Sequence, residues 1–213
     1  TGSPLSFLIE NKDQRTGDYD DLKETPRPGH ADYPASVKYL GYNDYRGGGH
    51  FSGRITAPLV FAGAVAKQVL GKEKIIIGSH ILSIADIREE PFDPVKVDRD
   101  LLQELAARDY PVMDEAKAFQ VEQLILKTGK ENDSVGGIVE TAVVNLPVGL
   151  GSPFFDSVES KISHLLFAVP AVKGVEFGAG FSITGMKGSQ ANDSFILKEG
   201  RVLTATNNSG GIQ

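Results

Sequence analysis

Apolar residues recur along this chain with two different periods, and segments of the two kinds follow one another irregularly. Alternating apolar residues or short β-branched runs predict strands at residues 5–9, 74–87, 137–146 and 175–184. Spacings of three and four predict helices at residues 55–70, 97–108, 113–128 and 154–169. Because these segments show no regular βαβ rhythm, the order favours an α+β fold with largely antiparallel sheets.

The size and charge of the chain limit what it can be. With 213 residues it can bury a real core, and we expect residues 1–213 to form a single domain. The net charge of -6 argues against a nucleic-acid partner, because phosphate backbones require clustered Lys and Arg. The chain has no Cys, which is compatible with a reducing cytoplasm. No apolar run approaches the ~20 residues of a membrane span, and no signal-peptide pattern opens the chain.

Residues 10–50 form a long polar segment without clear periodicity. A segment of this length inside a compact domain is usually functional or disordered. Four tyrosines supply aromatic anchors that low-complexity disorder lacks: Tyr33, Tyr39, Tyr42 and Tyr45. We therefore expect an ordered loop wrapped around a site. The helix predicted after it, at residues 55–70, is rich in Ala and Gly and should be closely packed and mostly buried.

The densest chemical signal is the sequence RGGGHFSGR at residues 46–54. Glycines let backbone N–H groups approach an anion, and the segment lies just before a helix N-terminus, which favours negative charge. Arg46 and Arg54 add guanidinium donors suited to phosphate or carboxylate, and Ser52 adds a hydroxyl. The alternative is a flexible turn with solvated arginines. Spacing alone does not decide between them, and the segment fits neither a Walker loop nor a dinucleotide fingerprint.

A second signal is RPGHADY at residues 27–33. Pro28 and Gly29 define a turn that presents His30, an imidazole able to exchange a proton near neutral pH. The alternative is an ordinary histidine on a surface loop. The four histidines show no close metal-ligand spacing, so we expect no metal site, and His80 and His164 are expected to be structural.

Together, these two stretches at this separation resemble the central signature of the chorismate synthase family. Segments in family order support the resemblance along essentially the whole chain: FLIENKDQ at 7–14, DSVGG at 133–137, VGLG at 148–151, AVKGVE at 171–176 and GSQAND at 188–193. The resemblance implies an α+β sandwich of helices between largely antiparallel sheets.

The resemblance also implies a reaction. Chorismate synthases are lyases of the shikimate pathway of aromatic amino acid biosynthesis. They remove phosphate from 5-enolpyruvylshikimate 3-phosphate by an anti 1,4-elimination, and they require reduced flavin mononucleotide (FMN) without net redox change. Some members reduce the flavin with NADPH and others depend on an external reductant, which this sequence leaves open. The family is cytoplasmic and usually homotetrameric, and it implies no membrane partner.

The resemblance assigns roles to particular residues. His30 matches the catalytic histidine placed near the N1–O2 edge of the reduced flavin. His50, Phe51 and Ser52 match the tripeptide that lines the flavin, and Pro170 and Ala171 match a second flavin contact. Ser52 and Arg54 match positions that bind the anionic groups of the substrate. Many members have Arg-Ser or Arg-Ala in place of His50-Phe51, so one positive charge is lost or depends on pH.

Family members are considerably longer, so we expect both ends of this chain to be interior cuts. The N-terminal Gly-Glu-Ser-His-Gly and C-terminal Arg-His-Asp motifs of the family are not in the sequence. Since residues of one catalytic constellation act as a unit, we expect this chain alone to be inactive as a synthase. The open alternatives are a fragment that binds flavin or an anion without catalysis and a purely structural domain.

Overall fold

The computed structural model describes residues 2–13 and 15–212, and its contacts divide the chain into two compact units. The first contains residues 1–65 and 165–173, and the second contains residues 66–164 and 174–213. The expectation of a single domain stays a prediction. Within the described residues, no helix is long and apolar enough to cross a membrane.

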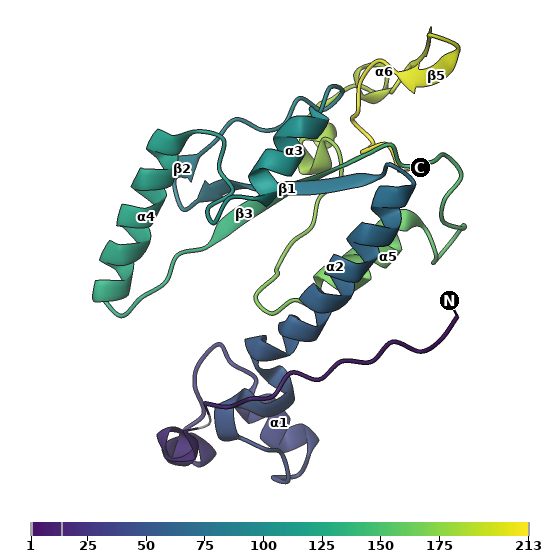
Figure 1. The fold of residues 1–213 in the computed structure, drawn as a ribbon. Helices are drawn as coiled ribbons and strands as arrows, with labels where there is room; N and C mark the ends of the chain where they lie inside the picture. The colour runs from purple at the N-terminus through teal and green to yellow at the C-terminus, as the bar shows by residue number, and fades with distance from the viewer. Residues whose placement is uncertain (1, 14, 213) are drawn as a thin grey trace. The chain divides into compact units, whose positions relative to one another are not determined.

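The first unit consists mainly of short helical turns that follow an extended N-terminal segment (Figure 1). These elements are η1 (Thr16–Lys23), α1 (Asp32–Lys38), η2 (Arg46–Phe51) and η3 (Gly53–Ile55), followed by the start of α2 (Thr56–Lys72). The strand predicted at residues 5–9 is wrong. The segment has no ladder partner in the described chain, and the Phe7 ring instead stacks on Phe61 of α2 with centroids 3.9 Å apart. An apolar run cannot show whether a neighbouring strand exists.

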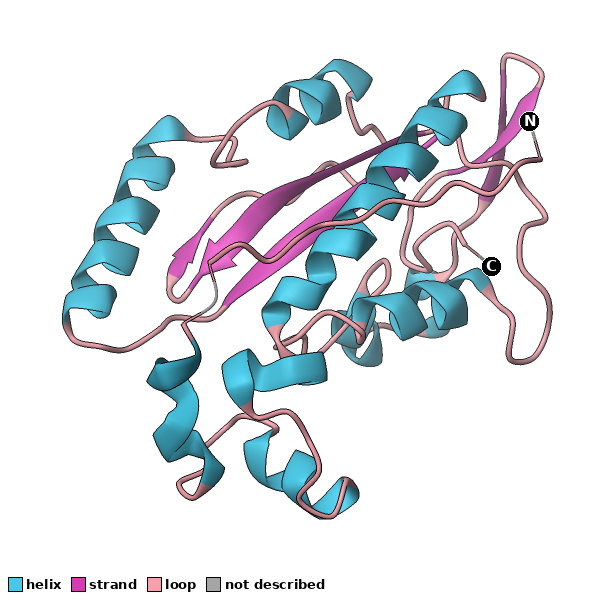
Figure 2. Ribbon diagram, turned by 60° about the horizontal axis from the view of Figure 1, so that its bottom comes forward, coloured by secondary structure: helices cyan, strands magenta, loops and turns pink. Residues whose placement is uncertain are grey.

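The second unit contains a three-stranded antiparallel sheet in the order β2-β1-β3. Figure 2 shows its two long strands, β1 (Ile76–Ile84) and β3 (Gly137–Val144), side by side. The short strand β2 (Ile87–Arg88) pairs with the end of β1. These antiparallel pairings, together with the helices, confirm the α+β class. The predictions at 74–87 and 137–146 are correct to within a few residues.

Two amphipathic helices of this unit begin where an aspartate caps them. Asp98 accepts a hydrogen bond from Asp100 N at the start of α3 (Arg99–Ala106), and Asp114 accepts one from Ala116 N at the start of α4 (Glu115–Lys130). The helix α3 packs on β1 and buries Leu102 and Leu105 completely or nearly so. These side chains form the core together with Phe92. The sequence therefore predicted both helices to within about two residues.

Three other expectations need correction. The segment predicted as a helix from 154 starts only at α5 (Val158–Leu166), because Ser152 and Asp156 form an isolated bridge and Ser157 Oγ accepts from Ser160 N at 3.1 Å. The strand predicted at 175–184 is wrong. Gly178 and Gly180 have φ of 57° and 52°, and the chain turns into η4 (Gly180–Gly185).

The third correction concerns α2. It has no buried residue, although its Ala and Gly content predicted a buried helix. Val60 and Val69 are 70% and 59% exposed. The apolar composition of a helix indicates that the helix can be buried, but it does not show whether other segments of the same chain cover it.

The polar tail contains structure that the sequence analysis missed. After the short helix α6 (Gly188–Ala191), the chain forms a hairpin of β4 (Phe195–Lys198) and β5 (Arg201–Thr204). Its turn residues Glu199 and Gly200 both have positive φ, at 51° and 75°. Tight two-residue hairpin turns require this conformation.

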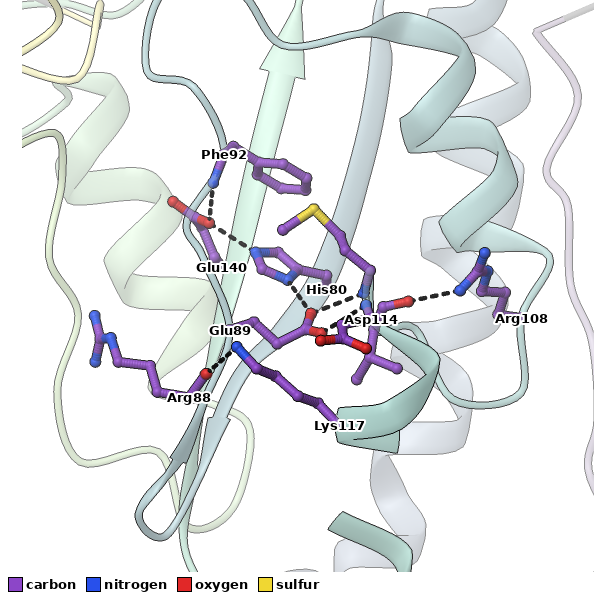
Figure 3. A network of polar contacts seen from close by, with 10 residues as sticks. His80, Arg88, Glu89, Phe92, Arg108, Asp114, Lys117 and Glu140 are labelled. Carbon is purple, nitrogen blue, oxygen red and sulfur yellow. Dashed lines mark hydrogen bonds and ion pairs between the residues drawn. The ribbon is translucent and has the colours of Figure 1, made fainter. Parts of the chain in front are cut away.

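A buried polar network ties the sheet of the second unit to the loops beside it (Figure 3). His80 of β1 is fully buried, and its ring nitrogens lie 3.2 Å from Glu89 Oε2 and 2.7 Å from Glu140 Oε2. Glu140 also accepts Phe92 N, while the two oxygens of Glu89 accept the N–H groups of Met113 and Asp114, all at 2.8 Å. The partners of His80 are thus those of a structural residue. His164, by contrast, lies exposed on α5.

The close approach of α3 to β1 depends on Gly78. A Cβ at this position would lie 2.7 Å from Leu102 Cβ and 2.9 Å from Leu102 Cδ2. We expect Gly78→Ala to lower the free energy of unfolding by about 1–3 kcal/mol, because the helix must shift away from the strand. Urea unfolding measures the change.

The matched control for Gly78 is Gly63→Ala. A Cβ on Gly63 in α2 meets nothing within 4 Å, so the better helix propensity of Ala should stabilise the protein by up to about 1 kcal/mol. Equal unfolding midpoints for the two variants would contradict this account of the α3–β1 packing.

Candidate functional site

The glycine run of the first unit adopts a conformation that other residues could not easily take. Gly47, Gly48 and Gly49 have φ of 63°, 80° and 50° in succession. A Cβ on Gly47 would collide with the guanidinium of Arg54, and a Cβ on Gly49 would lie 2.6 Å from Asp44 O. The loop therefore curls tightly enough for Arg54 Nη2 to donate to Gly47 O at 2.7 Å. The three glycines are required by backbone conformation and by close approach.

This loop borders a hollow of about 180 Å³ within the first unit. Four of the residues predicted for the site line it: His30, Phe51, Ser52 and Arg54. Cofactor pockets usually measure roughly 300–1,000 Å³, so this hollow holds one anionic group or one part of a larger ligand. The two stretches singled out in the sequence thus meet at one cavity.

The remaining predicted residues lie elsewhere in the first unit. His50 is exposed and is not among the described residues that line the hollow, and neither are Pro170 and Ala171. Ala171 has a φ of 69°, an unusual value for a residue with a side chain. Such a residue holds its neighbouring peptide groups in a fixed, turned orientation.

The two arginines of the glycine segment differ in what they contact. The side chain of Arg46 is engaged by Asp44: Nε and Nη2 donate to the two carboxylate oxygens at 2.8 and 3.1 Å. This pair holds the pKa of Asp44 below its ordinary value. The positive charge of Arg46 is therefore partly neutralised by a carboxylate two residues before it. Arg54 faces the hollow without a carboxylate partner in the described chain.

A smaller hollow of about 70 Å³ adjoins this one. Arg15 and Arg46 line it, and Tyr19, Gly47 and Arg54 line both hollows. Arg54 therefore lies where the two cavities meet, and its fork of N–H donors can face either one.

Among the lining residues that were not predicted as site residues, three have polar side chains: Tyr19, Arg27 and Asp32. Arg27 and Asp32 belong to the RPGHADY segment, and opposite charges flanking its Pro-Gly turn could have indicated a pair. Tyr19 comes from η1 within the polar segment. No feature of the sequence distinguishes it from the other tyrosines there.

Comparison with known proteins identifies the family. The sequence model of the family described as "Chorismate synthase" matches residues 1–213. The chain belongs to the chorismate synthase family. It is 46% identical to the chorismate synthase of Pyrococcus abyssi and 47% identical to that of Thermococcus kodakarensis, each over 214 residues. These alignments cover 100% of this chain but 58% of each relative, so the chain spans little more than half their length.

A solved structure described as "Crystal Structure of Chorismate Synthase" shares the fold. The TM-score is 0.74 at 28% sequence identity, and the match covers 86% of this chain and 57% of the other. The fold expected from the resemblance to chorismate synthases is therefore confirmed as α+β.

The departure at residues 50–51 can now be placed in this chorismate synthase chain. Phe51 lines the hollow, and its ring lies 6.5 Å from that of Tyr39 in a tilted arrangement. His50 is not among the described residues that line the hollow. The apolar residue of the pair therefore lines the cavity, and the histidine does not.

Proposed function

We propose that this chain forms part of the active site of a chorismate synthase, which eliminates phosphate from 5-enolpyruvylshikimate 3-phosphate to give chorismate. The observation that carries the proposal is the shared hollow of His30, Ser52 and Arg54 in a chain of this family. An imidazole, a hydroxyl and a guanidinium around one cavity suit a substrate with phosphate and carboxylate groups.

The residues of the hollow suit one part of a reduced flavin or one anionic group of that substrate. The glycine loop leaves its backbone open to close approach, and Phe51 supplies an apolar wall. Reduced FMN, when bound, supplies electron density that helps phosphate leave the substrate. In this proposal His50, Phe51 and Ser52 hold the flavin, with Pro170 and Ala171 as a second contact. The same proposal includes reduction of the flavin, either by NADPH or by an external reductant.

The chain's own residues would act in three ways. Arg54 and Ser52 bind and orient the anionic groups of the substrate, since a guanidinium fork and a hydroxyl both donate to oxygen. His30 would donate or hold a proton at the flavin, the role that the family resemblance gives it. Phe51 and Tyr19 limit the access of water to the hollow. On the basis of the family, the proposal also includes assembly of the complete protein as a homotetramer in the cytoplasm.

An anaerobic assay tests the proposed function. The sequence extended to the length of its relatives, mixed with photoreduced FMN and 5-enolpyruvylshikimate 3-phosphate, should release phosphate and chorismate. The 213-residue chain is assayed in parallel, with flavin binding followed by absorbance. Binding without turnover in both proteins would favour the alternative, a flavin- or anion-binding fragment, and the absence of both would contradict the proposal.

A further inference from the structure

Four arginines line the two hollows of the first unit, and three of them are paired with a carboxylate. The Nε atoms of Arg15, Arg27 and Arg46 lie 3.4, 2.9 and 2.8 Å from carboxylate oxygens of Asp13, Asp32 and Asp44. Arg54 has no such partner in the described part of the chain, and its Nη2 donates instead to a neutral carbonyl, Gly47 O, at 2.7 Å. Of the four, Arg54 is therefore the arginine whose charge these contacts leave uncompensated.

Arg54 is held at both ends of the residue. Its backbone N–H donates to Ser52 Oγ at 3.2 Å, and its guanidinium donates to Gly47 O. An unrestrained arginine side chain samples many rotamers, so these two contacts fix where its fork of N–H donors lies. Arg54 and Gly47 both line the two hollows, which places the guanidinium where the hollows meet.

Gly47 and its neighbour Gly48 share a backbone conformation but not their surroundings. Both have positive φ, at 63° and 80°. A Cβ on Gly48 would lie 3.7 Å from Ser52 Cβ, an ordinary van der Waals contact. A Cβ on Gly47 would instead collide with Arg54 Nη2 and lie 3.5 Å from Arg54 Cζ. Gly47 thus leaves room for the guanidinium and also provides the carbonyl that holds it.

We propose that Gly47 is a positioning residue for Arg54, which fixes the guanidinium at the junction of the two hollows so that its remaining N–H donors bind an anionic group of the substrate. An arginine has five N–H donors, and the bond to Gly47 O uses one of them. This inference rests on the proposed function and deepens it. It makes Gly47 necessary for substrate affinity and not only for the conformation of the loop.

Gly47→Ala tests the inference in the protein extended to the length of its relatives. It should lower kcat/KM about 10- to 100-fold, chiefly by raising KM, because misplacing a positioned group by ~1 Å can cost about 100-fold. Gly48→Ala is the matched control, since it introduces the same left-handed strain without a collision with Arg54. Its effect on KM should be clearly smaller. Anaerobic steady-state kinetics with photoreduced FMN measure both variants.

Double variants separate the positioning of Arg54 from strain in the loop. In the Arg54→Ala background no guanidinium is left to displace, so Gly47→Ala should raise KM no further than Gly48→Ala does. Gly48→Ala should change KM by the same factor in both backgrounds, because only residues in contact have non-additive effects. If Gly47→Ala also changes KM by one and the same factor in both backgrounds, the inference is overturned.

Urea unfolding without ligand tests the contact itself. Gly47→Ala should lower the unfolding midpoint more than Gly48→Ala when Arg54 is present, and equally when it is replaced by alanine. If the midpoints follow this pattern but KM is the same in the two glycine variants, the contact only fastens the loop and the inference is wrong.

A lysine at position 54 covers the case in which Gly47→Ala does not fold. Lysine has no second guanidinium nitrogen to meet the new Cβ, so Gly47→Ala should raise KM in the Arg54→Lys background no further than Gly48→Ala does. A larger rise overturns the inference. If the unsubstituted enzyme forms no chorismate, the proposed function fails and this inference with it, whereas turnover with additive effects overturns the inference alone.

Discussion

Replacing Arg54 by alanine should lower kcat/KM of the complete enzyme about 100-fold or more, chiefly by raising KM. Truncating one charged partner of a hydrogen-bonded anion site typically costs about 2–5 kcal/mol. Arg54 lines both hollows, and Nη2 also holds the glycine loop through Gly47 O at 2.7 Å. The substitution therefore removes the proposed ligand contact and the hydrogen bond that holds the loop. Steady-state kinetics with photoreduced FMN under anaerobic conditions measure the change.

Two further variants make this test specific. Arg54→Lys keeps the charge but presents one ammonium in place of a planar fork, so it should recover only part of the lost affinity. Arg201→Ala removes an exposed arginine from β5 in the other unit and should leave kcat/KM unchanged. Unaltered flavin and substrate affinities in Arg54→Ala would favour the interpretation of residues 46–54 as a turn with solvated arginines.

Replacing Glu89 by alanine should lower the free energy of unfolding by about 3–5 kcal/mol, because it breaks a buried network of hydrogen bonds to a carboxylate. Glu89 is 6% exposed, and its carboxylate accepts hydrogen bonds from the N–H groups of Met113 and Asp114 at 2.8 Å (Figure 3). Its loss leaves these groups and one ring nitrogen of His80 without their acceptor. An unsatisfied buried donor costs about 1–3 kcal/mol. Urea unfolding followed by circular dichroism measures the change.

The neighbouring residue provides the control for Glu89. Glu90 is exposed, so Glu90→Ala should change the free energy of unfolding by no more than about 0.5 kcal/mol. A loss of similar size in both variants would show that the network around His80 contributes little to stability. Glu89→Gln keeps the size and one acceptor oxygen, so its effect should lie between the two.

Local sequence signals predicted those elements whose ends are set by neighbouring residues. Asp98 and Asp114 cap α3 and α4, and an apolar stripe continues along each helix from its cap. In β1 and β3 the signal is the alternation of apolar residues along the strand. In these cases the physical cause lies within a few residues of the element itself. The segment at residues 5–9 was mispredicted because a strand requires a partner, which is a property of the whole fold.

The candidate site shows the same division. The sequence could predict that the glycines at 47–49 allow an unusual backbone conformation, and the structure gives all three a positive φ. The pairing of Arg46 with Asp44 could not be predicted, because neighbouring charges on a loop are usually solvated, whereas opposite charges on either side of the Pro-Gly turn could have indicated the pairing of Arg27 with Asp32. Tyr19 reaches the hollow only because the chain folds back there.

The sequence by itself determined the family, the α+β class and the two stretches proposed for the site, because all of these follow from residue types and their spacing along the chain. Only the tertiary structure decided that His30 and Arg54 line one cavity while His50, Pro170 and Ala171 do not line it. It also decided that His80 is buried between two carboxylates and that α2 has no buried residue. The physical reason is that burial, pairing and shared cavities depend on contacts between residues far apart in the chain, which no local pattern records.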